Sequence, residues 1–123
     1  MKNVLVNMLA VGSAGFVGAV LRYGIALALD TTTLPAGTFL INITGSFALG
    51  WFMAGPGTRL AADNTLRLAI TVGLIGTYTT FSTFMYQTDK FMIDGSWFRA
   101  AAYLSASVFV GLLAARAGAM LAG

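Results

Sequence analysis

The sequence predicts an all-α integral membrane protein with four transmembrane helices. Hydrophobic residues make up 58% of the 123 residues and charged residues only 9%, and the mean hydropathy is +0.83. A soluble domain usually carries about a quarter of its residues as charged groups to cover its surface. This chain lacks that cover, so its outer surface must face lipid. The helix count follows from four long apolar segments, separated by short stretches that hold most of the charges and both prolines.

A single domain over residues 1–123 accommodates these segments. Each helix is long enough to cross a bilayer, and the helices are expected at about residues 4–29, 38–54, 66–86 and 97–121. The connections have the composition of turns, since residues 30–37 and 55–59 are rich in Thr, Gly and Pro. Residues 87–96 hold Asp89, Lys90 and Asp94 and are expected to form the third loop.

Composition also excludes most enzyme chemistry. The chain has no Cys and no His, so disulfides, thiol nucleophiles and imidazole acid–base groups are absent. The acidic residues are all aspartates in loops or at loop edges, namely Asp30, Asp63, Asp89 and Asp94. We therefore expect no enzyme, because neither a nucleophile with its base nor a buried carboxylate pair can be assembled.

The distribution of basic residues bears on orientation in the membrane. Four spans place both termini on one side, and the 7 basic residues divide almost equally between the two sides. On the side of the termini lie Lys2, Arg59, Arg67 and Arg116, and opposite them lie Arg22, Lys90 and Arg99. Lys and Arg in short loops orient membrane proteins, so near balance predicts insertion in both orientations and an antiparallel homodimer. Alternatively, the early Lys2 alone fixes one orientation.

Polar residues inside the second and fourth helices are the first candidates for a site. Thr38, Asn42, Gly45 and Ser46 share one face of the second helix, which is either a helix contact or a hydrated path. Asn42 matters most, because a buried amide must satisfy its donors. On the fourth helix, Tyr103, Ser107 and Gly111 also share a face, either as a packing contact or as a polar track.

The third helix contains a run of residues that favour helix poorly, Gly73 to Phe84. Two glycines and several β-branched threonines at mid-span predict a break between Gly76 and Thr80. Such breaks persist at membrane depth where the freed backbone groups are buried, hydrated or bound to an ion. The alternative is an unbroken helix whose threonines bond to their own backbone.

Two phenylalanines and one arginine complete the candidates. Phe81 and Phe84 lie three residues apart, either as ordinary packing or as rings that present their positive edges to a small anion. Arg22 lies near the end of the first helix, where it either reaches the headgroups or raises the anion concentration in a vestibule.

Three segments resemble those of a known family. GTFLINITGSF over residues 37–47, GLIGTYTTFSTF over residues 73–84 and GAVLRY over residues 18–23 resemble the signature segments of the Fluc (CrcB-type) bacterial fluoride channels. The resemblance covers the whole chain. It departs from many relatives at Thr77, where they have a glycine, and from some at Gly111, where they have a serine.

The resemblance implies a dual-topology antiparallel homodimer with two fluoride pores, in the bacterial inner (plasma) membrane, that exports fluoride passively. Its partners would be fluoride, the lipid bilayer and a second copy of the chain, with no nucleic acid. Asn42 would donate its amide to fluoride, the edges of Phe81 and Phe84 would face the ion, and Arg22 would line the vestibule. Hydroxyls along or beside the pore would come from Thr38, Ser82, Thr83, Tyr103 and Ser107. Main-chain oxygens of Gly76 and Thr79 from both chains would hold a structural sodium ion that is not transported.

Two other classes of protein compete with this interpretation. A small multidrug transporter also has four short helices, but it needs a membrane-embedded carboxylate to exchange protons for drugs, and none is expected here. A non-transporting assembly subunit would use the polar stripes only to hold helices together.

Overall fold

A computed structural model describes residues 2–60 and 63–123, so Met1, Ala61 and Ala62 of the predicted domain lie outside the described residues. The helices are α1 (Lys2–Leu29), α2 (Ala36–Ala54), α3 (Pro56–Arg59), α4 (Asn64–Leu68), the π-helix η1 (Ala69–Ile75), α5 (Gly76–Tyr78), α6 (Ser82–Ile93) and α7 (Trp97–Ala122). Within the described ranges, four helical spans are long and apolar enough to cross a membrane. The predicted all-α class with four spans is therefore confirmed.

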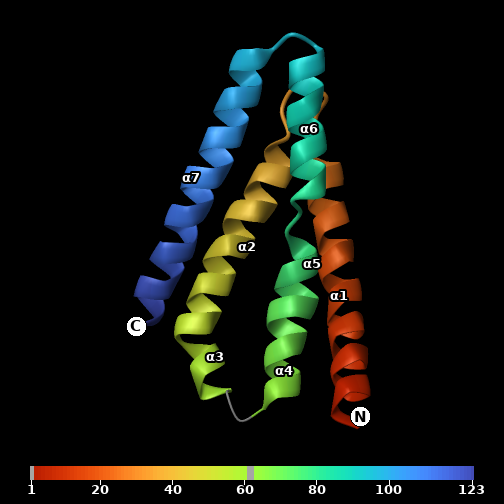
Figure 1. The fold of residues 1–123 in the computed structure, drawn as a ribbon, viewed down its shortest axis with the longest axis vertical. Helices are drawn as coiled ribbons and strands as arrows, with labels where there is room; N and C mark the ends of the chain where they lie inside the picture. The colour runs from red at the N-terminus through yellow and green to blue at the C-terminus, as the bar shows by residue number, and fades with distance from the viewer. Residues whose placement is uncertain (1, 61–62) are drawn as a thin grey trace.

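The four spans run roughly side by side along the long axis of the molecule (Figure 1). The third span is assembled from α4, η1, α5 and α6, and it lies beside α1. α2 lies between α7 and the third span, and its most extensive contact is with α7. Both ends of the chain lie at the lower end of the molecule in this view, as an even number of spans requires.

The third span is longer than the sequence predicted. It runs from Asn64 to Ile93, so the expected end near residue 86 is wrong by about two turns, and Gln87 lies on α6 rather than in a loop. The reason is a buried face with helical spacing, formed by Phe84, Thr88 and Phe91. Burial of this face keeps the segment helical despite the charges on its exposed side. The turn comes later, at Gly95, which has a positive φ of 79°.

Small residues let α2 and α7 approach backbone to backbone. A Cβ atom added at Gly50 would collide with the backbone carbonyl of Ala115, and one added at Gly118 would collide with that of Phe47. Close approach through small residues is the usual way in which helices associate in lipid, where apolar burial supplies little driving force. The α2–α7 pair is thereby held as a unit, which fixes one wall of the site described below.

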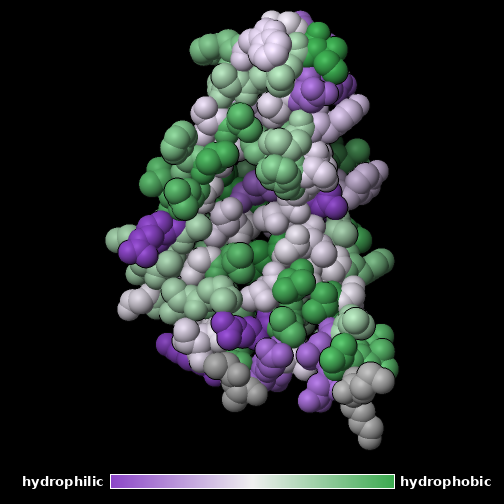
Figure 2. All heavy atoms as spheres, viewed as in Figure 1, coloured by the Kyte–Doolittle hydropathy of each residue, from purple (hydrophilic) through white to green (hydrophobic). Residues whose placement is uncertain are grey.

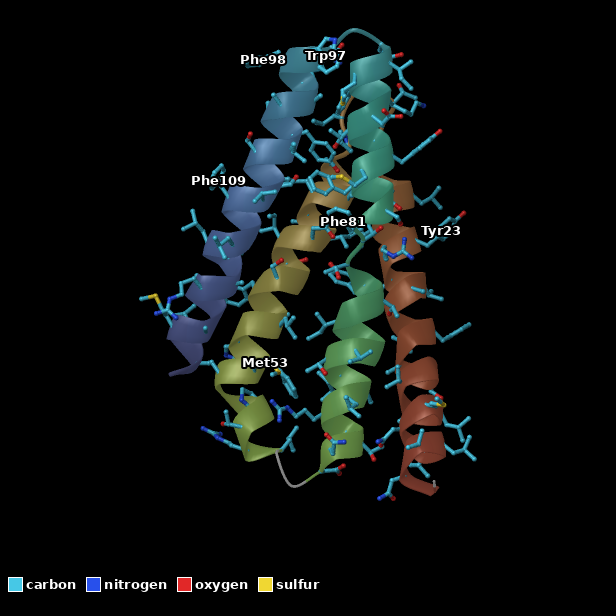
Figure 3. The ribbon with its side chains drawn as sticks, viewed as in Figure 1. Tyr23, Met53, Phe81, Trp97, Phe98 and Phe109 are labelled. Atoms are coloured by element: carbon cyan, nitrogen blue, oxygen red, sulfur yellow. The ribbon has the colours of Figure 1, made fainter. Side chains whose placement is uncertain are left out.

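The bundle buries few large side chains. Ile41, Phe52 and Phe84 are among the few that are at most 5% exposed, whereas large apolar side chains on all four spans are exposed. In Figure 2 hydrophobic residues spread over the flanks of the molecule, while hydrophilic ones gather at the lower end near α3 and α4. Trp97 and Phe98 lie at the upper end, and Phe109 projects outward from α7 (Figure 3). This distribution suits a chain whose flanks face lipid or another apolar surface.

Candidate functional site

The third span is interrupted between α5 and α6. Helical structure ends at Tyr78, Thr79 is extended with ψ of 159°, and α6 begins at Ser82. Asn42 on α2 faces this gap and bonds to its backbone twice. Its Nδ2 donates to the carbonyl of Thr80 at 2.9 Å, and its Oδ1 accepts from the backbone N–H of Thr80 at 2.8 Å. One side-chain amide thus satisfies both backbone groups of a residue that lies outside the helices.

The interruption frees two main-chain carbonyls from their helical donors. In a continuous helix the N–H of Thr80 would bond to the carbonyl of Gly76, but here it donates to Asn42. The N–H of Thr83 would bond to the carbonyl of Thr79, but here it donates to Thr80 Oγ1 at 3.2 Å. The carbonyl oxygens of Gly76 and Thr79 therefore lack the donors that a continuous α-helix would give them.

Arg22 bonds to the backbone just before the interruption. Its Nε donates to the carbonyl of Thr77 at 3.0 Å, and the side chain is half-buried between α1 and α5. A cation at this point stabilises the C-terminal end of the first part of the span, where unpaired carbonyls carry partial negative charge. Arg22 therefore has a structural contact in addition to the vestibule role suggested by the sequence.

A cavity of about 310 Å³ lies between α2, the interruption and α7. Among the predicted site residues, its lining contains Asn42, Gly76, Thr79, Phe81, Phe84 and Ser107. Gly45 and Ser46 of the predicted α2 face also line it, so this face meets a cavity along part of its length. The structure thus brings together groups from three separate segments of the sequence.

The two phenylalanines of the cavity have very different environments. Phe84 is 5% exposed, whereas Phe81 is 73% exposed and lies at the interruption (Figure 3). Their ring centroids are 6.3 Å apart with an interplanar angle of 81°, which is an edge-to-face arrangement. The edge of one ring is therefore directed at the face of the other, and Phe81 offers most of its surface outside the monomer.

Ser107 supplies an unpaired hydroxyl to the same cavity. Its residue is 8% exposed, and within the described part of the chain its Oγ finds no hydrogen-bond partner. Buried polar atoms are nearly always hydrogen-bonded, because leaving one unpaired costs about 1–3 kcal/mol. The Ser107 hydroxyl is therefore free to bond to a group that enters the cavity.

The remaining predicted hydroxyls lie outside the lining of this cavity. Ser82 is exposed and Thr83 is half-buried. Thr38 is 1% exposed and its hydroxyl donates to Asp30 Oδ2 at 2.8 Å. The hydroxyl of Tyr103 donates to Gln87 Oε1 at 2.7 Å.

Asp30 and Gln87 are polar partners for which the sequence predicted a place in loops. Asp30 directly follows α1, yet its carboxylate reaches α2 and accepts hydrogen bonds from it. The signal for Gln87 was the helical spacing of Phe84, Thr88 and Phe91, which extends α6 past this residue. No local pattern marks Asp30, because its carboxylate bonds to residues on α2 and α6 that are brought to it by the packing of the helices.

Thr77 and Gly111 are the two positions at which the sequence departs from the signature segments that it resembles. The hydroxyl of Thr77 donates within its own span to Gly73 at 2.6 Å and is 3.1 Å from the carbonyl oxygen of Gly15 on α1. Gly111 lies near Ser46, whose Oγ is 3.8 Å from the position of an added Cβ. The hydroxyl of Thr77 therefore has hydrogen-bond partners within the bundle and needs none from the cavity. At Gly111 there is room for a small side chain.

Four spans, the third of them interrupted, with neutral polar groups at the interruption, define a small multi-pass membrane protein with an internal polar site. Residues 9–119 match the family of CrcB-like proteins, described as camphor resistance (CrcB). This match covers most of the sequence, so the chain belongs to the CrcB family.

Similar proteins from bacteria carry channel names. Fluoride-specific ion channel FluC 2 of Geobacillus kaustophilus (strain HTA426) is 45% identical over 113 residues, which cover 89% of this chain and 88% of that protein. Fluoride-specific ion channel FluC of Chloroflexus aurantiacus (strain ATCC 29366 / DSM 635 / J-10-fl) is 40% identical and covers 88% of both chains. FluC of Chlorobaculum tepidum is 40% identical over 97% of this chain and 96% of its own length. From these relatives and the four apolar spans it follows that this chain is a multi-pass bacterial membrane protein.

Proposed function

We propose that this chain is a fluoride-specific ion channel that lets fluoride leave the cell passively and so relieves fluoride toxicity. Relatives named for this activity match almost the whole chain, at identities of 45% and 40%. Their names are those of channels, in line with the expectation from composition that the chain is not an enzyme. Export by a channel needs no coupled energy source, because the negative membrane potential drives an anion outward.

The observation that carries the proposal is the unpaired hydroxyl of Ser107 in the cavity with Asn42. The amide of Asn42 has two hydrogens, and the bond to Thr80 uses one of them. A second N–H and a free O–H can therefore meet at one cavity, beside the ring edges of the phenylalanines. Fluoride is small and strongly hydrated, so a pore must replace its water with several donors while avoiding a fixed charge that would hold it too tightly.

The proposed channel is an antiparallel homodimer with two pores, each lined by both subunits. Phe81 is 73% exposed in the monomer although it lines the cavity. A second copy packed against this face would bury the ring and close the cavity. The near balance of basic residues on the two sides favours insertion in both orientations, which an antiparallel pair requires.

A structural sodium ion is proposed at the centre of the dimer, held by the carbonyls of Gly76 and Thr79 from both chains. The donor set fits this ion, since these oxygens have lost their helical donors and unwound carbonyls are a common sodium ligand in membrane proteins. Bound there, the ion supplies positive charge that neutralises the exposed carbonyl dipoles. Replacing sodium with N-methylglucamine should lower the unfolding temperature of the purified dimer, and an unchanged temperature would contradict the site.

Fluoride efflux from liposomes tests the proposed function. Vesicles loaded with potassium fluoride and containing only the purified protein should release fluoride when a potassium ionophore carries the compensating charge. Matched vesicles loaded with potassium chloride should keep their chloride. Absence of ionophore-dependent fluoride release would favour a non-transporting subunit. Release coupled to protons in a fixed ratio would favour a transporter.

Orientation can be tested separately, because the chain has no Cys. A single cysteine introduced at Asp94, in the turn between α6 and α7, should react with a membrane-impermeant maleimide from both sides of the membrane. Labelling from one side only would contradict dual insertion.

A further inference from the structure

A second polar cluster, distinct from the Asn42 cavity, joins the end of α1 to three other helices. Asp30 Oδ1 accepts from the backbone N–H of Thr38 at 2.9 Å, and Oδ2 accepts from its hydroxyl at 2.8 Å. Gln87 Nε2 donates to Asp30 Oδ2 at 3.2 Å and to Thr38 Oγ1 at 3.0 Å. The hydroxyl of Tyr103 donates to Gln87 Oε1 at 2.7 Å. We call these four residues the Asp30 cluster.

The hydrogen bonds of the Asp30 cluster run in one direction, from Tyr103 through Gln87 to the carboxylate of Asp30. An ionised carboxylate only accepts hydrogen bonds, so both groups that face Asp30 Oδ2 must donate to it. This fixes the amide of Gln87 with its NH₂ towards Asp30, because the opposite orientation would set two oxygens against each other. The carbonyl of Gln87 then faces Tyr103 and accepts its only hydroxyl hydrogen. The charge at Asp30 thus sets the direction of the hydrogen bond between Gln87 and Tyr103, although Tyr103 does not contact the carboxylate itself.

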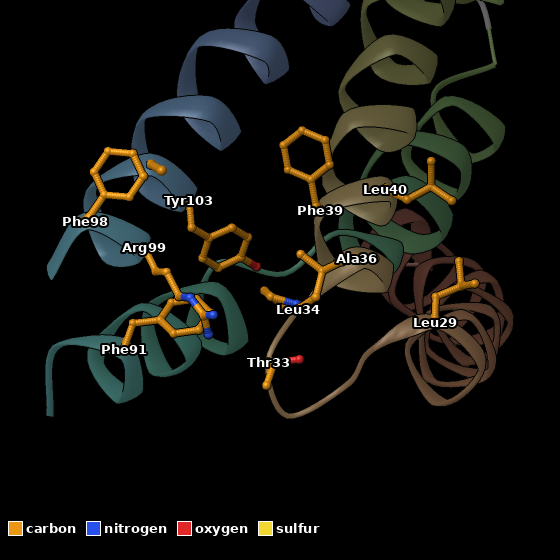
Figure 4. Close-up of a pocket in the computed structure, with 12 residues that line it drawn as sticks. Leu29, Thr33, Leu34, Ala36, Phe39, Leu40, Phe91, Phe98, Arg99 and Tyr103 are labelled. Carbon is orange, nitrogen blue, oxygen red and sulfur yellow. The ribbon is translucent and has the colours of Figure 1, made fainter. Parts of the chain in front are cut away.

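The cluster ends next to the proposed pore. The ring of Tyr103 lies edge-on to Phe84, with centroids 5.0 Å apart and an interplanar angle of 89°. Phe84 lines the Asn42 cavity, while Tyr103 lines a second, larger cavity of about 810 Å³. Figure 4 shows the Tyr103 ring extending from α7 towards the start of α2 in this second cavity. Tyr103 therefore lies between the two cavities.

From this geometry we propose that Asp30 is a positioning residue for permeation, which holds the hydroxyl hydrogens of Thr38 and Tyr103 away from the ion. The proposal rests on the function proposed above. Tyr103 then presents an oxygen with lone pairs rather than a donor at the end of the pathway. An anion leaving the Asn42 cavity then meets no O–H donor from Tyr103 before it reaches the second cavity, whose lining includes Arg99. Asp30 in this way favours release of fluoride over tight binding.

The variant Asp30→Asn tests this role with little change in shape. Its Oδ1 can still accept from the backbone of Thr38, so the contact with α2 is kept. Its new NH₂ group faces Thr38 and Gln87, which reverses the Gln87 amide. Thr38 then donates to the Gln87 oxygen, and the hydroxyl hydrogen of Tyr103 is freed. We expect fluoride efflux to saturate at a lower concentration and its maximal rate to fall by about fivefold, the equivalent of one hydrogen bond. Asp89→Asn, on the exposed side of α6, is the matched control and should behave as the wild type.

Exchanging the carboxylate of Asp30 and the amide of Gln87 distinguishes an effect of hydrogen-bond direction from an effect of packing. Gln87→Glu alone sets two carboxylates together where the wild type has a 3.2 Å hydrogen bond, so it should lower the unfolding temperature. The double variant Asp30→Asn with Gln87→Glu again pairs one carboxylate with one amide, and the new carboxylate still accepts from Tyr103. Both the unfolding temperature and the fluoride efflux should return to near wild-type values.

The proposal is overturned if Asp30→Asn conducts like the wild type, or if the double variant fails to restore efflux. If Asp30→Asn does not fold, the double variant decides alone. Wild-type efflux from it supports the proposal, and lost efflux or failure to fold contradicts it. A wild-type protein that releases no fluoride would instead contradict the proposed function. The unfolding temperatures of the four proteins would still test the cluster.

Discussion

Asn42 and Thr80 exchange two hydrogen bonds across the bundle, of 2.9 and 2.8 Å. The pair lies 38 residues apart in sequence and connects α2 to the interruption of the third span. Because the amide bonds to both the N–H and the carbonyl of Thr80, it replaces the helical partners that this residue lacks. Asn42 thus stabilises the interruption and, through its second N–H, can still contribute a donor to the cavity.

Substitution of Asn42 by aspartate should block fluoride efflux. The carboxylate would replace a donor to the carbonyl of Thr80 with an oxygen, and it would place negative charge in the path of an anion. Loss of the hydrogen bond to the Thr80 carbonyl, which would then face a carboxylate oxygen, costs about 1–3 kcal/mol. We therefore expect at least a tenfold lower efflux rate. Asn64→Asp makes the same chemical change at an exposed site on α4 and should leave efflux unchanged. Equal fluoride efflux from Asn42→Asp and Asn64→Asp would show that Asn42 does not lie on the fluoride pathway.

Two glycines should respond to alanine with opposite signs. A Cβ added at Gly45 would collide with Thr79 Cγ2 at the interruption, whereas one added at Gly12 meets nothing within 4 Å. Gly45→Ala should therefore destabilise the protein by about 1–3 kcal/mol through overpacking. Gly12→Ala should stabilise α1 by roughly 0.5–1 kcal/mol, the usual gain for alanine in a helix. Thermal unfolding in detergent measures both, and a stable Gly45→Ala protein would contradict the close contact.

Removal of the Ser107 hydroxyl should reduce efflux without reducing stability. Since this hydroxyl has no internal partner among the described residues, Ser107→Ala breaks no hydrogen bond within the monomer. The cavity nevertheless loses a donor, so we expect efflux to fall by about fivefold, the equivalent of one hydrogen bond. Ser105→Ala, two residues away on the exposed side of α7, is the control. A drop in unfolding temperature together with unchanged efflux would indicate a purely structural serine.

The sequence was sufficient to predict the spans, since their lengths and apolar composition are local properties. It predicted the wrong end for the third span, because Asp89 and Lys90 suggested a loop while burial of Phe84 and Phe91 keeps the segment helical. Local charge is a weak guide to a helix end when the charged side chains face outward and the opposite face is buried.

Prediction of the site was partial for a different reason. Asn42 stood out because an amide in an apolar helix needs partners, but nothing near it in sequence indicates Thr80. Asp30 was missed in the same way, since its carboxylate is bonded to residues on α2 and α6. The residue type shows which side chains need hydrogen-bond partners. Only the packing of separate segments determines which residues those partners are.

The most direct test of the account compares two phenylalanines of equal exposure. Phe81 at the interruption and Phe16 on α1 are both 73% exposed, but only Phe81 lines the Asn42 cavity. If neutral donors and ring edges at this cavity carry fluoride, Phe81→Ile should reduce fluoride efflux from liposomes by about tenfold or more, the loss of roughly 1.4 kcal/mol of stabilisation. Phe16→Ile should conduct like the wild type. Undiminished efflux through Phe81→Ile would contradict the account.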